Sequence, residues 1–451
     1  MKKIITIASL LLASASLPAS ADTLTQALSS GLLKSDSLNA ARQNYVAVRE
    51  SVTIAQSGND LSGTVTVSGS QTESDKKNAS GGFQSSQAFS AKIGISKQLY
   101  DSGEAEARVT AANYNIATAK ANYRALEQAT ILSVIDAYLT LLTSAESRAL
   151  QEENVARLTA QTQATQIRLD AGTTTATRLA EANARLARAR SNLITAIANE
   201  ETARETYQSL TGLSGDDLSL PTMLGALPST LAEAETRAVA NHPDMVAAQS
   251  NERAARTQFD ILARQVLPKV KFSLSATDSQ AKGTMQDKLD IKGEVTLTSP
   301  FIVTPSSRAK GKETAAKLER AKYQLADTRR KIALDARSAL RSLKAANAQS
   351  EAVDVELEAA ELVAEGIRAE VEFGQKIFLD QLDAEQSVSD AKVRKIQAQQ
   401  SIMINHFRLL ASMGELDSAL LGVTDVLPSL ENEPSPRDVF TGLLPLADLP
   451  E

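Results

Sequence analysis

Two carboxylates, Asp380 and Asp383, are the residues whose type and spacing are best suited to chemistry in this chain. They stand three positions apart, shortly after Gly374 and at the predicted start of a helix, so both project from one side of it. Such a pair could act on cations by charge. The alternative interpretation is that they are ordinary acids of a helix N-terminus, stabilised by the positive end of the helix dipole.

No set of residues typical of an enzyme accompanies them. The chain has no cysteine and no tryptophan, and its two histidines, His242 and His406, are far apart in sequence and offer no metal site. Acid pairs such as Glu152 and Glu153 have no nucleophile or base partner and are interpreted as solvated helix faces. We therefore expect no catalytic residue, no cofactor and no metal, and predict that the protein is not an enzyme.

The composition also limits where the protein can work. Residues 1–21 have the form of an export signal, with Lys2 and Lys3 ahead of an apolar stretch. Cleavage there removes two lysines from a chain of formal charge −6 and leaves −8, which argues against non-specific binding to nucleic acid. No later segment has about 18 consecutive apolar residues, so the sequence excludes membrane-spanning helices. If a membrane is involved, strands closed into a barrel must cross it.

The chain is a domain-sized duplication. Thr23 recurs as Thr230, and Gly172 recurs as Gly374, with similar flanking residues in each case. The spacing of about two hundred residues is far longer than that of a short solenoid repeat. The expected boundaries are a signal peptide over 1–21, a first structural repeat over 22–212, a linker over 213–229, a second repeat over 230–413 and a Pro-containing C-terminal tail over 414–451.

Each repeat combines strands with very long helices. Alternation with a period of two predicts strands at about 61–70 and 87–99 in the first repeat and at about 269–277 and 288–299 in the second. The polar segments between them, near 71–86 and 277–287, are predicted as solvent loops. Helical hairpins are predicted over about 103–210, turning at Gly172, and over about 308–411, turning at Gly374. A helical pattern also covers about 22–56, and the tail is expected to lie on the outside or to be disordered.

Four strands are too few to close a barrel, because the smallest single-chain barrels have about 8. The protein must therefore protect its sheet edges in a soluble form or pool strands from several copies. Three copies would supply twelve strands.

At this point the motifs resemble those of the TolC family of trimeric outer-membrane efflux and type I secretion channel proteins. The resemblance covers nearly all of the mature chain and rests on the order and duplication of short motifs. These motifs are Thr23 to Leu28, Gln98 to Gly103, Asn241 to Asp244, Val266 to Val270, and Phe373-Gly374 followed by Asp380 to Ala384. In the second repeat, Ser299 to Val303 lacks the glycine found at the corresponding junction of the first.

The resemblance implies a fold that is mainly α with a small β part. Duplicated α-helical hairpins would form a coiled-coil tunnel, and four strands per subunit would join a 12-stranded trimeric outer-membrane β-barrel. The homotrimer would lie in outer-membrane lipid with its helices in the periplasm. It would be the passive exit duct of a tripartite efflux pump, of a type I protein secretion system, or of both.

The implied partners are a periplasmic adaptor, or membrane fusion protein, and an inner-membrane pump or ABC transporter; nucleic acid is not among them. The alternative is a periplasmic adaptor or scaffold protein built on coiled-coil hairpins. The two strand pairs with long tips argue against it, since adaptors usually flank one hairpin with a lipoyl-like module and barrel domains of short β-elements.

The resemblance also assigns roles to residues near the hairpin turns. Asp380 and Asp383 would lie at the periplasmic tip, where three-fold symmetry makes carboxylate rings that narrow the tunnel and select cations. Lys376 and Arg178 become candidates for a latch that holds the tip closed; the alternative for Lys376 is a solvated loop lysine. Arg178 replaces an acid that is frequent in the family, and we expect it to pair with an acid of an adjacent hairpin.

Overall fold

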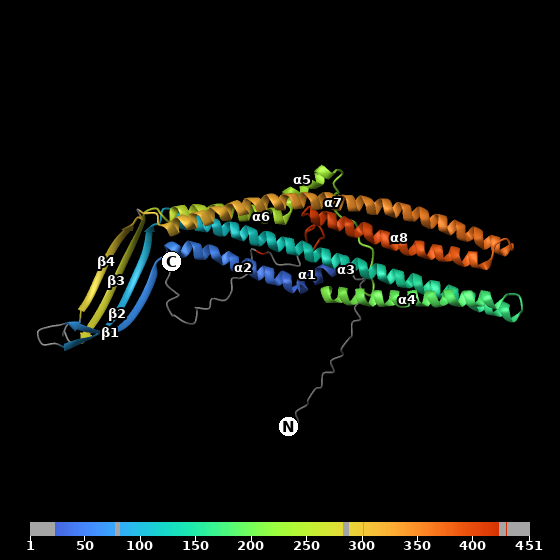
Figure 1. Ribbon diagram of the computed structural model, residues 1–451, viewed down its shortest axis with the longest axis horizontal. Helices are drawn as coiled ribbons and strands as arrows, with labels where there is room; N and C mark the ends of the chain where they lie inside the picture. Colours follow the sequence, from blue (N-terminus) through green and yellow to red (C-terminus); the bar gives the residue numbers. More distant parts are fainter. Residues whose placement is uncertain (1–22, 77–81, 283–287, 301, 424–429, 431–451) are drawn as a thin grey trace, which may run out of the picture.

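The protein is an elongated assembly of helices with one sheet at its end (Figure 1). The computed structural model describes residues 23–76, 82–282, 288–300, 302–423 and 430. The predicted signal peptide over 1–21 and most of the predicted tail lie outside these residues. Among the described residues, helices predominate and a single antiparallel sheet of four strands completes the fold, which confirms the predicted class, mainly α with a small β part.

The same order of elements occurs twice along the chain. The first half contains α1 (Leu24–Lys34), α2 (Asp36–Gln56), a short 3-10 turn (Ser57–Asn59), β1 (Ser62–Lys76), β2 (Gly82–Tyr100), α3 (Glu104–Asp170) and α4 (Ala176–Thr211). The second half contains α5 (Leu231–Asn241), α6 (Pro243–Arg264), β3 (Lys269–Lys282), β4 (Lys288–Thr298), α7 (Pro305–Glu372) and α8 (Phe378–Ser412). Each half is thus two helices, two strands and a long helical hairpin.

The repeated threonines have a structural role as helix caps. The hydroxyl of Thr23 accepts from the backbone N–H of Gln26, and the Gln26 side chain accepts from the backbone N–H of Thr23. The hydroxyl of Thr230 likewise accepts from the backbone N–H of Glu233, whose carboxylate accepts from Ser229. The helix predicted over about 22–56 is interrupted at Ser35, whose hydroxyl caps α2. That single helical expectation is therefore wrong at one position, because a serine that bonds the next turn starts a new helix.

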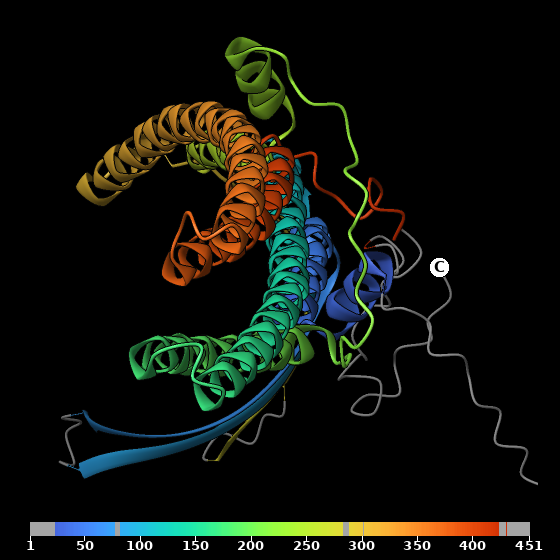
Figure 2. The same cartoon turned by 90° about the vertical axis from the view of Figure 1, so that its right-hand side faces the viewer.

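The long helices set the length of the molecule. α3 has 67 residues and α7 has 68, so each is about 100 Å long at 1.5 Å per residue. Seen along the long axis, the helices trace an open arc rather than a closed bundle (Figure 2). One 18-residue stretch of α3 is long and apolar enough to cross a membrane by length and composition, but 56% of it is buried inside the protein. We therefore interpret that stretch as a core helix.

The sheet has one apolar and one polar face. Directly opposed residues share a face, and the row Val65, Ile93, Ala276 and Ile291 is apolar across all four strands. Alternate positions on the same strands carry serine, threonine and charged residues. The apolar face consists mainly of Val65, Val67, Phe89, Ala91, Ile93, Ile95, Val270, Phe272, Leu274, Ala276, Leu289, Ile291, Val295 and Leu297. Many of these side chains are exposed, among them Val65 at 73% and Ile291 at 72%.

The strands are longer than their apolar pattern predicts. β1 and β2 stay paired out to Lys76 and Gly82, so most of the solvent loop predicted over 71–86 is instead β-ladder. β3 likewise continues to Lys282, inside the second predicted loop. The prediction failed because the backbone hydrogen bonds of a strand do not require apolar side chains. At these strand ends the residues are polar on both faces, so the ladder extends beyond the apolar part of the sheet.

Asymmetric junctions join the sheet to the long helices. Before α3, the carboxylate of Asp101 accepts from the backbone N–H groups of Gly103, at 2.9 Å, and Ala105, at 2.6 Å, while Gly103 takes a left-handed conformation with φ of 75°. Before α7, Thr304 caps the helix and Pro305 follows it as the first helical residue. The second junction thus uses a different local solution, consistent with its missing glycine.

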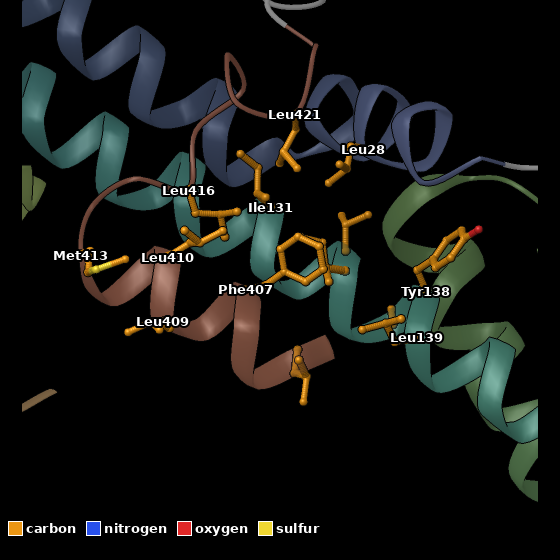
Figure 3. Packing of buried hydrophobic residues seen from close by; sticks show 14 of the residues in the cluster. Leu28, Ile131, Tyr138, Leu139, Phe407, Leu409, Leu410, Met413, Leu416 and Leu421 are labelled. Carbon is orange, nitrogen blue, oxygen red and sulfur yellow. The ribbon is translucent and has the colours of Figure 1, made fainter. Parts of the chain in front are cut away.

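The main core lies midway along the molecule, where α1, α3 and α8 meet. Phe407 and Leu410 of α8, Ile131 and Leu139 of α3 and Leu28 of α1 gather in one cluster (Figure 3). Leu416, Leu421 and Val423 join this core at 0%, 6% and 2% exposure. The start of the predicted tail is therefore packed inside, and the expectation of an external or disordered tail is wrong for residues 414–423.

Candidate functional site: the hairpin tips

Both long hairpins end in closely similar turns at the end of the molecule farthest from the sheet (Figure 1). Gly172 and Gly374 have φ of 72° and 74°, the left-handed conformation that favours glycine. After each glycine the chain bonds back to the helix end, from the N–H of Thr173 to the carbonyl of Arg168 at 2.8 Å and from Gln375 to Glu370 at 2.8 Å. These bonds satisfy the last carbonyls and reverse the chain.

The returning helices begin differently. α4 has a side-chain cap, because Thr175 accepts from the backbone N–H of Arg178 at 3.4 Å. α8 has Ile377 as its N-cap residue and no side-chain cap, and Asp380 lies in its first turn. This position gives Asp380 a favourable interaction with the helix dipole. The dipole interpretation of Asp380 therefore has a direct structural basis.

Asp383 connects the two hairpins. It forms an ion pair with Arg185 of α4, and the side chain of Arg185 is 25% exposed against 61% for Asp383. The structure thus brings one predicted acid to a base on the other hairpin. Exposed pairs are worth about 0–1 kcal/mol each, so this contact biases the hairpins' position without locking it.

A second carboxylate, Glu385, makes a more buried connection. Its side chain is 8% exposed and faces Arg157 of α3 at 3.7 Å and Arg368 of α7 at 3.4 Å. The amide of Gln381 also donates to it at 3.0 Å. Glu385 of α8 therefore contacts both its own hairpin and the other one. Removal of its charge would leave the guanidinium groups of Arg157 and Arg368 without a carboxylate between them.

A small apolar cluster supports these polar contacts. Leu382 and Phe378 of α8 pack against Leu158 of α3 and Leu186 and Ala189 of α4. The leucine between the two aspartates thus points into the first hairpin. Because this cluster is small, packing near the tips depends more on polar pairs than packing in the main core does.

The two predicted latch residues remain without such contacts. Arg178 and Lys376 are exposed, and neither forms an ion pair with any residue in the part of the chain that the structure describes. Arg185, which does pair with an acid of the other hairpin, lies seven residues and two turns after Arg178 on the same side of α4.

Sequence reasoning missed Arg185, Glu385, Arg157 and Arg368. It compared residues between equivalent positions of the two repeats, whereas these pairs join non-equivalent positions. A signal was available: the apolar residues at seven-residue spacing on α4, including Leu186, locate the face that packs against a neighbour, and Arg185 borders that face.

The architecture and the tip geometry define a class of protein: a long helical conduit with an apolar-faced sheet at its far end. The sequence profile of the outer membrane efflux protein family matches residues 27–213 and 236–415, which together form most of the chain. The protein therefore belongs to that family. It is an outer-membrane exit duct with its helices in the periplasm, and not a periplasmic adaptor.

Known relatives agree with this assignment. The outer membrane efflux protein BepC of Brucella suis biovar 1 (strain 1330) is 26% identical over 406 residues, covering 89% of this chain and 87% of that one. The Campylobacter jejuni outer membrane channel CmeC has a TM-score of 0.74 at 14% identity, covering 87% of this chain and 85% of that one. The outer membrane protein VceC of Vibrio cholerae has a TM-score of 0.72 at 16% identity, covering 87% and 96%. Fold and family thus coincide over both repeats.

Proposed function

We propose that three copies of this chain form one continuous duct, with a 12-stranded barrel in the outer membrane and a helical tunnel below it. The observation that carries the proposal is the continuous apolar face across four strands whose outer members, β1 and β4, each have one partner within the sheet. A lipid-exposed sheet cannot leave such edges open, because unpaired backbone groups are costly in hydrocarbon.

The number of copies follows from the lumen that a duct needs. Two copies would give eight strands, and side chains fill the interior of a barrel of that size. Three copies give twelve strands and an open interior. On β4 the apolar face runs from Leu289 to Leu297, about 27 Å along the strand and about 20 Å along the membrane normal at a tilt near 40°. This height is close to the ~25 Å of an outer-membrane apolar band.

At the other end, the hairpin tips form the gate. Asp380 and Asp383, repeated three times, supply carboxylates around the opening and favour cations there. The pair of Asp383 with Arg185 and the contacts of Glu385 hold the second hairpin against the first in the closed state. Arg178 and Lys376, exposed in one chain, are available to acids of a neighbouring subunit and complete the latch.

The duct itself supplies no energy source, so the proposal includes partners. A periplasmic adaptor joins the tips to an inner-membrane pump or ABC transporter, and cargo leaves through the tunnel. The relative BepC is an outer membrane efflux protein, which favours efflux over protein secretion as the first role to test.

Single-channel recording of the detergent-purified protein in a planar bilayer tests the proposal. We expect small, cation-selective openings that divalent cations block from the periplasmic side. Block should be lost in the Asp380→Ala, Asp383→Ala variant, while Glu372→Ala, an acid before the turn, serves as control. A protein that is soluble without detergent and gives no conductance would refute the duct.

A further inference from the structure

The polar face of the sheet carries an excess of positive charge that the gate does not explain. Among the residues whose side chains the structure describes, the charged ones on this face are Lys92 on β2, Lys269 and Lys271 on β3, and Lys288, Asp290, Lys292 and Glu294 on β4. All of them alternate with the apolar residues of the other face. Under the proposed duct, on which this inference rests, the apolar face contacts lipid and these residues line the exit lumen.

Most of these charges are compensated by near neighbours. On β4, Lys288 pairs with Asp290 at 3.0 Å and Lys292 pairs with Glu294 at 2.9 Å. Lys269, at the base of β3, pairs with the buried carboxylate of Glu104. Each of these lysines therefore adds little net charge to the lumen.

Lys92 and Lys271 are different. Both side chains are exposed, and neither forms an ion pair with any residue of the described chain. Lys92 lies in a row with Thr66 and Thr277, and Lys271 lies opposite Gln98 and Thr296, so their neighbours across the ladder are neutral. The nearest acids on this face already have partners. Asp290, two strands from Lys92 and about 10 Å away at the usual strand spacing, pairs with Lys288, and Glu294, diagonal to Lys271 on β4, pairs with Lys292.

We infer that Lys92 and Lys271 make the strand-lined exit section favour anions, in opposition to the cation preference of the tip carboxylates. Three-fold repetition gives two rings of three lysines. Lys92 lies opposite Thr277 of β3, which is six residues from Lys271, so the two rings are about 20 Å apart along the strands. A tilted 12-stranded barrel has a backbone radius of roughly 12 Å. The Debye length of about 10 Å at 0.1 M salt is comparable with that radius, so the rings act across the whole lumen.

The test is the ratio of cation to anion permeability, from reversal potentials in a KCl gradient near 0.1 M. The parent protein is the Asp380→Ala, Asp383→Ala variant, which leaves the exit section to dominate selectivity. We expect Lys92→Gln with Lys271→Gln to raise the ratio about threefold. Loss of the lysine charges lowers the energy of a monovalent cation in the lumen by roughly half of RT and raises that of an anion by the same amount. Near 1 M salt, where the Debye length is about 3 Å, the difference should shrink.

Two matched controls sharpen the result. Lys97→Gln removes a lysine of the same strand from the opposite, apolar face and should leave the ratio unchanged. Lys92→Arg with Lys271→Arg keeps the charge and should keep the ratio of the parent. An unchanged ratio in the glutamine variant, or an equal change in Lys97→Gln, would overturn the inference while the duct stands. Absence of conductance in wild type and parent would overturn both.

Discussion

Glu385 offers the sharpest test of how the two hairpins are held together. Glu385→Gln keeps the size of the side chain and one carbonyl acceptor for Gln381, and removes only the negative charge. In the wild type that charge faces Arg157 and Arg368 from a side chain that is 8% exposed. After the substitution, the two guanidinium groups face each other without a carboxylate between them.

The magnitude follows from the exposure of each partner. Breaking a fully buried ion pair costs about 3–5 kcal/mol, and an exposed pair contributes about 0–1 kcal/mol. The side chains of Arg157 and Arg368 are 39% and 62% exposed, so water can solvate them again. We therefore expect a loss of about 1–2 kcal/mol from the closed arrangement, which changes a two-state equilibrium by a factor of roughly 5–30.

Open probability in planar bilayers measures this loss directly. We expect Glu385→Gln to open more often than wild type by about that factor, with the temperature of thermal unfolding little changed, because the main core is distant. Glu356→Gln is the matched control: Glu356 pairs with Arg394 at 2.6 Å, but both residues belong to the second hairpin and are about half exposed. Equal open probabilities in Glu385→Gln and Glu356→Gln would show that Glu385 does not hold the hairpins together.

Three further predictions concern folding. Burial alone would raise the pKa of Glu104, but the hydrogen bond from Lys269 and the nearby positive charges lower this pKa overall. The ionised carboxylate therefore stabilises the fold at pH values above the ordinary pKa of 4.5. This stabilisation is lost as the pH falls through the lowered pKa. Glu104→Gln should cost about 1–2 kcal/mol in urea unfolding at pH 7, and an unchanged midpoint would contradict this. Burial, together with the charge of Asp417, raises the pKa of Glu127, so the fold favours its protonated form and loses stability as pH rises from 4.5 through the raised value. Glu127→Gln should therefore raise the melting temperature at pH 7 and have no such effect near pH 4; a lower melting temperature at pH 7 would refute this. Leu416→Ala should cost about 2–5 kcal/mol because the side chain is fully buried, whereas an external tail would show no loss in the same unfolding assay.

Periodicity predicted the elements well because it follows the side-chain repeat of each element, about two residues in a strand and about 3.6 in a helix. Alternation over Phe89 to Ile95 and the uninterrupted run after Gly103 correspond to β2 and α3 in the structure. The same criterion failed at the strand ends, where the ladder continues through polar residues. It also failed at Leu416, because an apolar residue without a regular period gives no sign that its segment returns to the core.

The tip contacts were harder to predict, since they depend on how two hairpins pack rather than on either hairpin alone. The pattern around Gly374 located Asp383 at the turn, but its partner Arg185 comes from a helix almost two hundred residues earlier. The spacing of residues within one repeat does not show which residue of the other repeat lies opposite. Only the relative placement of α4 and α8, fixed in part by Leu186 and Leu382, brings the two side chains together.

The charges at the tips also show why the two repeats had to diverge. Identical copies would place like charges at equivalent positions, and hairpins packed side by side would then repel each other or pair in several ways. In this chain Arg178 stands where the second repeat has Asp380, Asn183 stands where it has Glu385, and Arg185 stands where it has Ser387. At positions 178 and 185 the first hairpin thus carries a base where the second carries an acid or a neutral residue, while Glu181 keeps the acid of Asp383. Contact between the unlike hairpins is attractive where Arg185 meets Asp383 and Arg157 meets Glu385. Under the proposed trimer, such pairing favours a ring in which first and second hairpins alternate.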